Sequence, residues 1–424
     1  MAFLLKSAGC AVRANNARQQ TERKRATSVA NTAWRVAVVG AGPVGLALAL
    51  HAARLLPHSS VTLFDARPAE RDVSSDARTL ALALGSVQFL QQLGAWPEAA
   101  AEPIREIHIS QTTPTAWLPG GTPEVHLSAR ELRLPLLGAV LPYGALVAPL
   151  QRAWQAAVDA QPQRLRSRFG TPVAGLKALP DAVEVDAGIA EPFDLAVVAE
   201  GGVFSEQARK AVVRDYAQTA WVGQVDIEGG SPGRAFERFT RHGPAALLPL
   251  PGAVAGVQRA ALVWCVDSRD DPVLPLDASQ RLAVLNTVFP AAAGRLVAIT
   301  ELKAFPLGLN AERSLVQGRV VRIGNAAQTL HPVAGQGLNL GLRDAHALVA
   351  QLRWAGDLDQ ALSRVNWARA PDRWALIAAT DFLARSFTWD LPGLATARGL
   401  ALAALQATPL AKAWLARRMM FGAR

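Results

Sequence analysis

The sequence of 424 residues predicts an α/β protein with a parallel sheet, an inserted antiparallel sheet and a helical C-terminal tail. Three observations lead to this class. The apolar run VAVV at 36–39 leads directly into a glycine-rich turn, GAGPVG, at 40–45. A second glycine-rich segment follows at 324–341. Between them, from about 212 to 305, the chain shows the alternation that is typical of antiparallel strands.

The first turn has the composition of a Rossmann-like phosphate-binding turn. Gly40 permits the tight turn, Gly42 lets the backbone approach a pyrophosphate, and Gly45 lets helix and strand pack closely. A helix that opens at Pro43 directs unpaired N–H groups at the phosphates. A second short strand ends at Asp65, twenty residues after Gly45, where a carboxylate accepts both hydroxyls of an adenosine ribose. The alternative is an ordinary strand–helix turn, and the pattern itself does not separate FAD from NAD.

The distance between the two glycine-rich segments favours a flavin that is held from both sides. A strand is expected at 319–323 and a long helix from about Gly337 to Arg353. The N-terminus of that helix would direct free N–H groups at the anionic end of an isoalloxazine ring. A glycine-rich loop that only caps a C-terminal helix is the alternative.

These segments are similar to those of the class A flavoprotein monooxygenases. The resemblance is to their ubiquinone-biosynthesis branch, of the 2-polyprenyl-6-methoxyphenol hydroxylase type. The matching stretches are 39–50, 75–82, 214–220, 236–240, 247–250 and 324–344. The resemblance covers residues 34–422 and implies a para-hydroxybenzoate hydroxylase-like fold.

The resemblance also implies roles for individual residues. Arg78 would contact the FAD pyrophosphate, Asn325 would meet the ribityl chain, and Pro332 would lie beside the ring. Gly337, Leu338 and Asn339 would bind the pyrimidine edge of the ring, and Gly335 would also belong to the cofactor-binding residues. FAD would be the cofactor, NAD(P)H a transient reductant and O2 the co-substrate. A polyprenylated phenol would be hydroxylated through a flavin hydroperoxide, with the flavin carrying the difficult step.

Two departures from the family pattern concern the nicotinamide step. The family usually has an Asp-Gly pair after a mid-chain strand, whereas this chain has Glu200 and Gly201, which keep the carboxylate on a longer side chain. Tyr143 stands where the family tends to place a polar or basic flavin contact. Both changes are compatible with FAD binding. They leave open a non-catalytic flavoprotein-like scaffold, besides a hydroxylase of a small soluble aromatic compound.

No residue is assigned as catalytic, because no nucleophile–base pair or carboxylate dyad emerges. His331 lies in the second motif near Pro332, and its simplest role is a hydrogen bond to the backbone there. Gln218 and Arg238 could face the substrate cavity or act as structural partners within the sheet. The antiparallel sheet over the flavin is the expected place for the aromatic substrate.

The composition excludes several other classes of protein. Two cysteines cannot build a disulfide framework, and seven histidines without ligand spacing predict no metal site. No apolar run is long enough for a membrane span. The net charge is +10, but the basic residues are not interleaved with stacking aromatic residues, so no nucleic-acid partner is expected.

Four regions follow from these patterns. We expect a basic, disordered extension at 1–33, a discontinuous FAD-binding domain at 34–210 and 306–355, a β-rich substrate domain at 211–305 and a helical tail at 356–424. The tail carries leucines, Trp414 and five basic residues without an acid after Leu391. It could pack on its own domain or lie on an anionic membrane. The expected location is the bacterial cytoplasm, with peripheral contact to the inner membrane and a ubiquinone-biosynthesis complex left open.

Overall fold

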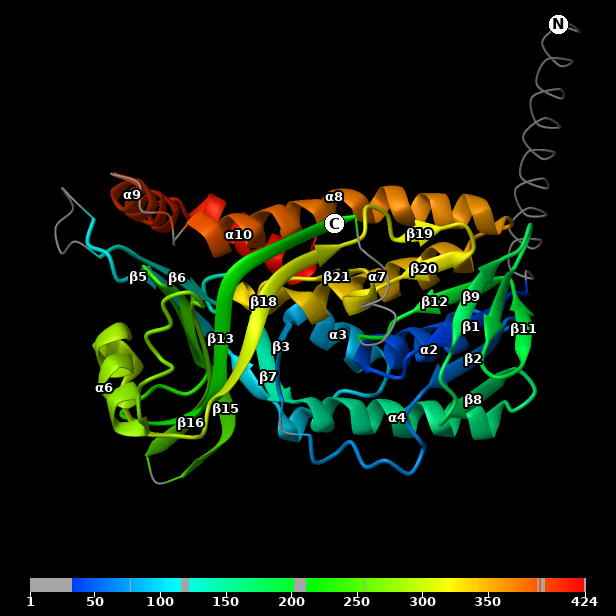
Figure 1. The fold of residues 1–424 in the computed structure, drawn as a ribbon, viewed down its shortest axis with the longest axis horizontal. Helices are drawn as coiled ribbons and strands as arrows, with labels where there is room; N and C mark the ends of the chain where they lie inside the picture. Colours follow the sequence, from blue (N-terminus) through cyan, green and yellow to red (C-terminus); the bar gives the residue numbers. More distant parts are fainter. Residues whose placement is uncertain are drawn as a thin grey trace, which may run out of the picture.

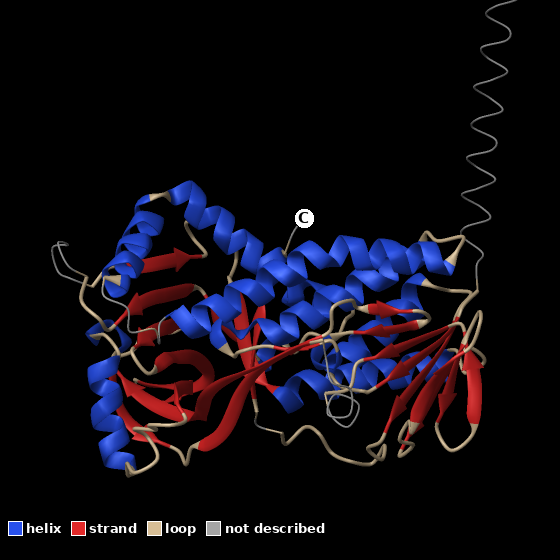
Figure 2. Ribbon diagram, turned by 45° about the horizontal axis from the view of Figure 1, so that its top comes forward, coloured by secondary structure: helices blue, strands red, loops and turns tan. Residues whose placement is uncertain are grey.

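The computed structural model describes residues 33–76, 78–115, 122–201, 211–254, 256–386, 389 and 393–422. In these residues the strands form two large sheets and two three-stranded ones. Helices pack along the sheets, and the long helix α8 extends along one side of the molecule past both large sheets (Figures 1 and 2). The basic extension expected at 1–33 lies outside the described residues except for Ala33.

The first large sheet is the parallel sheet that the sequence predicts. Its strand order is β19-β20-β12-β1-β2-β8, and all neighbours pair in parallel except β19 and β20. The bounds are β1 (Arg35–Val39), β2 (Ser60–Asp65), β8 (Leu165–Phe169), β12 (Leu195–Val198), β19 (Val316–Gln317) and β20 (Val320–Arg322). Valines and leucines fill β1, β2 and β12 because both faces of the sheet are covered.

Helices cover one face of this sheet and a small sheet covers the other (Figure 2). On the helical face, Val36 and Val38 pack in one core with residues of α2 (Pro43–Leu55), α4 (Tyr143–Ala160) and α7 (Gln336–Arg353). On the other face, Ala37 and Val39 pack with β10 (Val183–Asp186). Its partners are β9 (Gly175–Ala178) and β11 (Ala190–Phe193). The carboxyl ends of β1 and β2 therefore lie in a buried part of the sheet that is covered on both faces.

The second large sheet has nine strands, in the order β21-β18-β13-β16-β15-β14-β5-β6 with β17 paired to β13. The bounds are β5 (Glu106–Gln111), β6 (Glu124–Ser128), β13 (Val212–Glu228), β14 (Arg234–Thr240), β15 (Gly243–Val254), β16 (Val257–Asp267), β17 (Arg295–Ile299), β18 (Lys303–Ala311) and β21 (Gln328–Thr329). Helix α6 (Ala278–Val288) covers one face. The sheet thus takes β5 and β6 from well before the expected insertion at 211–305.

One sequence-based expectation is wrong. The sequence predicts a helix at about 79–93, between the second strand of the parallel sheet and residue 107. In the structure residues Thr79–Ala83 form strand β3, and helix α3 begins only at Leu84 and ends at Gln92. Strand β3 pairs antiparallel with β7 (Gly138–Pro142), which also pairs with β4 (Glu102–Ile104). The alternation of this segment is short, so a partner strand more than fifty residues away decides its conformation.

The C-terminal region is helical, as expected, and is divided at a proline. Its helices are α8 (Leu358–Ser386), α9 (Leu394–Ala407) and α10 (Pro409–Phe421). Part of the tail packs on the rest of the chain, since Ala416 and Met420 are buried in a core with residues of β6 and β7. Leu410 and Trp414 remain exposed. None of the helices in the described residues is long and apolar enough to cross a membrane.

Candidate flavin site and substrate cavity

Two glycines allow the tight turn after β1 and the close packing of the helix that follows it. Gly40 has a φ of +104°, which a residue with a side chain rarely adopts, and its N–H donates to Phe64 at 2.8 Å. A Cβ on Gly45 would lie 1.9 Å from the Gly40 carbonyl oxygen, so helix α2 can approach the strand only because position 45 is glycine. Pro43 is the first residue of α2, and the open N-terminus of the helix follows Gly42.

Asp65 stands at the end of β2, beside this turn, as predicted. Its buried carboxylate accepts the Ala41 N–H at 2.6 Å and the Arg67 guanidinium at 2.9 Å. Burial alone would raise the pKa of Asp65, but the hydrogen bonds from Arg67 and Ala41 outweigh it and lower the pKa. Arg67 also donates to the Ala41 carbonyl at 2.9 Å. The sequence did not reveal Arg67, although it lies only two residues after Asp65.

Glu200 and Tyr143 both lie at the same turn. A Cβ on Gly40 would lie 2.7 Å from the Glu200 Cγ, and one on Gly42 would lie 3.9 Å from the Tyr143 hydroxyl. Burial and the Asp65 charge raise the pKa of Glu200, while Arg67 opposes that shift. The longer side chain of Glu200 therefore contacts the first glycine of the dinucleotide turn.

Arg78 lies beside Tyr143, and its guanidinium contacts two protein side chains. Its guanidinium is 4.3 Å from the centre of the Tyr143 ring and forms an ion pair with Asp76 at 2.7 Å. Its side chain is 68% exposed, so it can move towards a ligand. Its predicted contact with the pyrophosphate remains a prediction.

The second glycine-rich segment lies beside the first. Gly201 and Asn325 are neighbours, since a Cβ on Gly201 would be 3.5 Å from the Asn325 Nδ2. Gly341 packs on both Gly324 and Val44, because its Cβ would lie 2.8 Å from the Gly324 Cα and 2.9 Å from the Val44 Cγ2. The structure therefore brings α2, the end of β12 and the start of α7 to one place.

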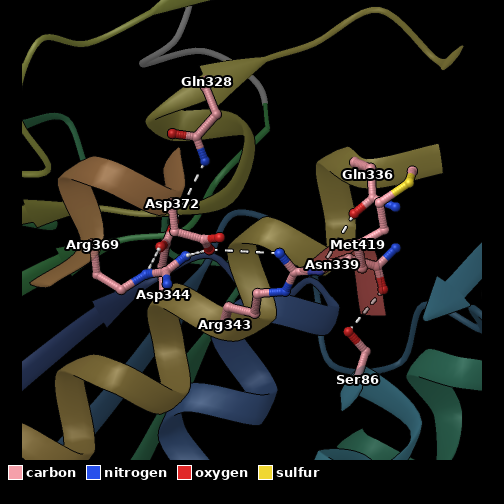
Figure 3. Close-up of polar contacts among 9 residues, drawn as sticks. All are labelled: Ser86, Gln328, Gln336, Asn339, Arg343, Asp344, Arg369, Asp372 and Met419. Carbon is pink, nitrogen blue, oxygen red and sulfur yellow. Dashed lines mark hydrogen bonds and ion pairs between the residues drawn. The ribbon is translucent and has the colours of Figure 1, made fainter. Parts of the chain in front are cut away.

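Asn339 has a structural role that the sequence did not predict. Its Oδ1 accepts from the Ser86 hydroxyl (Figure 3) and from the Ala83 N–H, both at 2.8 Å. Its Nδ2 donates to the Ala81 and Gly335 carbonyls at 3.1 and 2.8 Å. The side chain thus joins α7 to β3 and α3. The side-chain oxygen and nitrogen of Asn339 are therefore both bonded to protein groups, and its predicted contact with the flavin ring remains a prediction.

A buried network of charges holds α7 in place (Figure 3). Asp344 on α7 forms an ion pair with Arg369 on α8 at 2.7 Å. Arg369 reaches Asp372 at 2.9 Å, and Asp372 reaches Arg343 on α7 at 3.5 Å. Arg343 also donates to the Met419 carbonyl on α10. The three helices are therefore coupled next to the second glycine-rich segment.

An apolar cavity of about 170 Å3 lies between the second large sheet, strands β3 and β7, the start of α7 and helix α10. Pro332, Gly335 and Gln336 line the part of its wall at the start of α7. Met419 and Met420 of α10 line another part. A cavity of about 150 Å3 already holds a benzene ring, so this one accommodates an aromatic ring where the substrate was expected.

His331 is buried and lies outside the lining of this cavity. Its Nδ1 accepts the Val333 N–H at 3.2 Å, and its Nε2 is 2.9 Å from the Gln218 Oε1. Burial lowers the pKa of His331 to about 4, so the ring is neutral at pH 7. The backbone hydrogen bond expected beside Pro332 is present, and Gln218 is its structural partner in β13.

Three possible metal ligands come together on the other face of the second sheet. The side chains of His108, Glu124 and His126 lie on paired strands β5 and β6, with ligand atoms within 4.8 Å of one another. The sequence did not reveal this cluster, because the two histidines are neighbours only across the strand pair. Residues 107, 109 and 127, which alternate with them, line the cavity on the opposite face.

Comparison with known proteins decides the family. Residues 251–358 match the family model described as FAD binding domain. The chain is 31% identical over 398 residues to the 3-demethoxyubiquinol 3-hydroxylase of Escherichia coli (strain K12), which covers 89% of this chain and 95% of the relative. The chain belongs to the ubiquinone-biosynthesis hydroxylases. These are FAD-dependent monooxygenases, so the resemblance seen in the sequence is confirmed.

Two further comparisons agree. The ubiquinone hydroxylase UbiL of Rhodospirillum rubrum is 31% identical over 402 residues, which covers 90% of this chain and 88% of UbiL. The structure of HpxO from Klebsiella pneumoniae, solved with FAD and uric acid, is 19% identical with a TM-score of 0.66 and covers 92% of this chain and 97% of HpxO. The likeness to HpxO confirms the para-hydroxybenzoate hydroxylase-like fold.

FAD is the cofactor of this hydroxylase, and the residues present fit it. A Cβ on Gly42 would meet only the Tyr143 hydroxyl at 3.9 Å, so the backbone at this position is open to a phosphate, and the Asp65 carboxylate accepts the N–H of the neighbouring Ala41. When bound, FAD takes electrons from the reductant and activates O2. The phosphate-binding role of the first turn and the role of the N-terminus of α7 remain predictions.

Proposed function

We propose that the protein hydroxylates the aromatic ring of a polyprenylated phenol in ubiquinone biosynthesis, with NAD(P)H as reductant. The observation that carries this proposal is the apolar cavity, since Pro332 and the start of α7 line it together with the antiparallel sheet. An apolar lining suits a ring with a hydrocarbon tail better than a small charged aromatic acid. This observation favours the lipid-tailed substrate over a soluble one.

The individual contacts with FAD are part of the proposal. The backbone of Gly42 and the N–H groups that open α2 at Pro43 would bind the pyrophosphate, with Arg78 moving onto it. Asn325 would meet the ribityl chain, and Gly337 and Leu338 would bind the pyrimidine edge of the ring. Glu200 and Gly201, beside the turn, would meet FAD and the transient nicotinamide.

The division into domains is proposed in a modified form. Residues 34–210 and 306–355 would form the FAD-binding domain and 211–305 the substrate domain, with a helical tail from 356. Strands β5 and β6 pair into the sheet of the substrate domain through β14, so these two strands serve that domain as well.

Helix α10 could link the cavity to a membrane surface. Its residues Ala416, Met419 and Met420 line the cavity, while Leu410 and Trp414 on the same helix are 86% and 64% exposed. Basic residues beside exposed Trp and Leu favour an anionic lipid surface. We therefore propose peripheral contact with the inner membrane of a bacterial cell, which leaves open the partners in a biosynthetic complex.

The biological test is expression in an E. coli strain that lacks its 3-demethoxyubiquinol 3-hydroxylase. We expect restored ubiquinone, measured in lipid extracts, if the protein acts on the same precursor. Accumulation of an earlier or later phenolic precursor would indicate that the protein hydroxylates a different position of the ring. No effect on any precursor would contradict the proposal. In the same cells, membrane contact predicts recovery in the membrane fraction, and recovery in the cytosol alone contradicts it.

A further inference from the structure

The cavity contains one acidic side chain that no role above explains. Glu237 lies on β14 and is the only residue with a carboxyl group among the described residues that line the cavity. Side chains alternate along a strand, and the next residue, Arg238, donates to Ser110 at 2.8 Å and to the Val288 carbonyl at 3.1 Å on the other side of the sheet. Arg238 therefore does not neutralise Glu237.

The carboxyl group of Glu237 has no protein partner. It makes no hydrogen bond or ion pair to any residue in the described part of the chain. Its cross-strand neighbour is Ala246, and Cys265 also lines the cavity. Glu237 is half-buried and faces an apolar lining, so a polar group that enters the cavity is the natural partner of its carboxyl group.

The protonation of Glu237 suits an exchange of protons near neutral pH. Burial raises the pKa of Glu237 to about 8. Cys265 is the only other titratable group among the described cavity-lining residues, and burial together with Glu237 raises the pKa of its thiol. A general base is most effective when its pKa lies near the working pH.

We infer that Glu237 is a catalytic residue that binds the phenolic hydroxyl of the substrate and accepts its proton. The inference rests on the proposed function, because it requires a phenol in this cavity. In the step, the phenol O–H bond breaks, a carboxyl O–H bond forms, and the electron pair stays on the phenolate oxygen. The ring positions ortho and para to that oxygen become more electron-rich, which favours attack on an electrophilic oxygen. The proton returns when the product regains its hydroxyl, so Glu237 undergoes no net change.

The test compares Glu237→Gln with Glu228→Gln in FAD-loaded protein. The first variant keeps the shape but cannot accept the proton, and the second removes an exposed carboxyl group at the end of β13 in the same sheet. With ortho-prenylphenol as substrate, we expect Glu237→Gln to lower kcat about a hundredfold with little change in KM. The rise of kcat with pH near 8 should also disappear. Glu228→Gln should behave as the wild type, and a wild-type kcat and pH profile in Glu237→Gln would overturn the inference.

A binding measurement separates this inference from the proposed function. Binding of para-cresol, followed by the change in flavin absorbance, requires no turnover, and Glu237→Leu should weaken it about tenfold by removing the hydrogen bond. Normal turnover in all variants would contradict the role of Glu237 but not the proposed hydroxylase function. If the wild type hydroxylates no phenol but Glu237→Leu binds para-cresol more weakly, the proposed hydroxylase function fails while the contact between Glu237 and the phenol stands.

Folding provides a check that the variant is intact. The pKa of Glu237 is raised to about 8 in the folded state. As pH rises from the ordinary pKa of a glutamate to about 8, this side chain therefore lowers the free energy of unfolding. Glu237→Gln should therefore melt at a higher temperature than the wild type at pH 8 and at nearly the same temperature at low pH. An equal melting temperature at both pH values would show that the carboxyl group is solvated, which contradicts the inference.

Discussion

Replacement of Gly42 by alanine is expected to abolish retention of FAD while the protein stays folded. Gly42 has a φ of −75° and a ψ of −179°, which alanine adopts without strain, and an added Cβ would meet only the Tyr143 hydroxyl at 3.9 Å. That methyl group would stand where the backbone must approach the pyrophosphate. The measurement is the visible flavin spectrum after loading with FAD and removal of the unbound fraction.

The matched control for this prediction is Gly175→Ala. Gly175 lies in β9, and an added Cβ there would have nothing within 4 Å. This variant should keep the flavin spectrum of the wild type, and circular dichroism should show both variants folded. A Gly42→Ala protein that retains FAD like the control would mean that the phosphates bind elsewhere, and the assignment of the first turn would fail.

The second large effect is expected from Asp344→Asn. Asp344 is fully buried, and its carboxylate is 2.7 Å from Arg369, whose side chain is also buried. The substitution keeps the shape but removes the negative charge, which leaves Arg369 with one carboxylate fewer inside the protein. Breaking a buried pair in this way costs about 3 kcal/mol of the free energy of unfolding. Urea unfolding of the purified protein measures that loss.

Asp359→Asn is the control for the loss of a charge. Asp359 on α8 forms an ion pair with Arg319 at 3.2 Å, but its side chain is 72% exposed, so its removal should cost less than about 1 kcal/mol. Equal unfolding midpoints for the two variants would show that the network in Figure 3 does not hold α7.

Local patterns in the sequence predict much of this fold. The strand, turn and helix at 35–55 follow from apolar periodicity and three glycines, and β2 ends at Asp65 as expected. Strands β5 and β6 were missed because β6 pairs with β5, and β5 pairs with β14, whose residues lie 128 positions later in the chain. The same reason explains β3, whose strand conformation depends on β7.

The site was predictable where one short segment carries the chemistry. Gly40, Gly42, Gly45 and Asp65 come together through neighbouring strands of one sheet. The roles of Arg67 and Asn339 depend on side-chain geometry that spacing alone does not give. Glu237 lay inside a recognised stretch, but only the packing of the sheet over the cavity shows that its carboxyl group is unpartnered.

The most direct test of the central claim follows the oxygen atom. FAD-loaded protein would be supplied with NAD(P)H, ortho-prenylphenol and isotopically labelled O2, and the product would be analysed by mass spectrometry. The proposed function predicts a phenol with one additional hydroxyl group that carries the label. Consumption of NAD(P)H with hydrogen peroxide as the only product, or an unchanged phenol without reductant consumption, would contradict it.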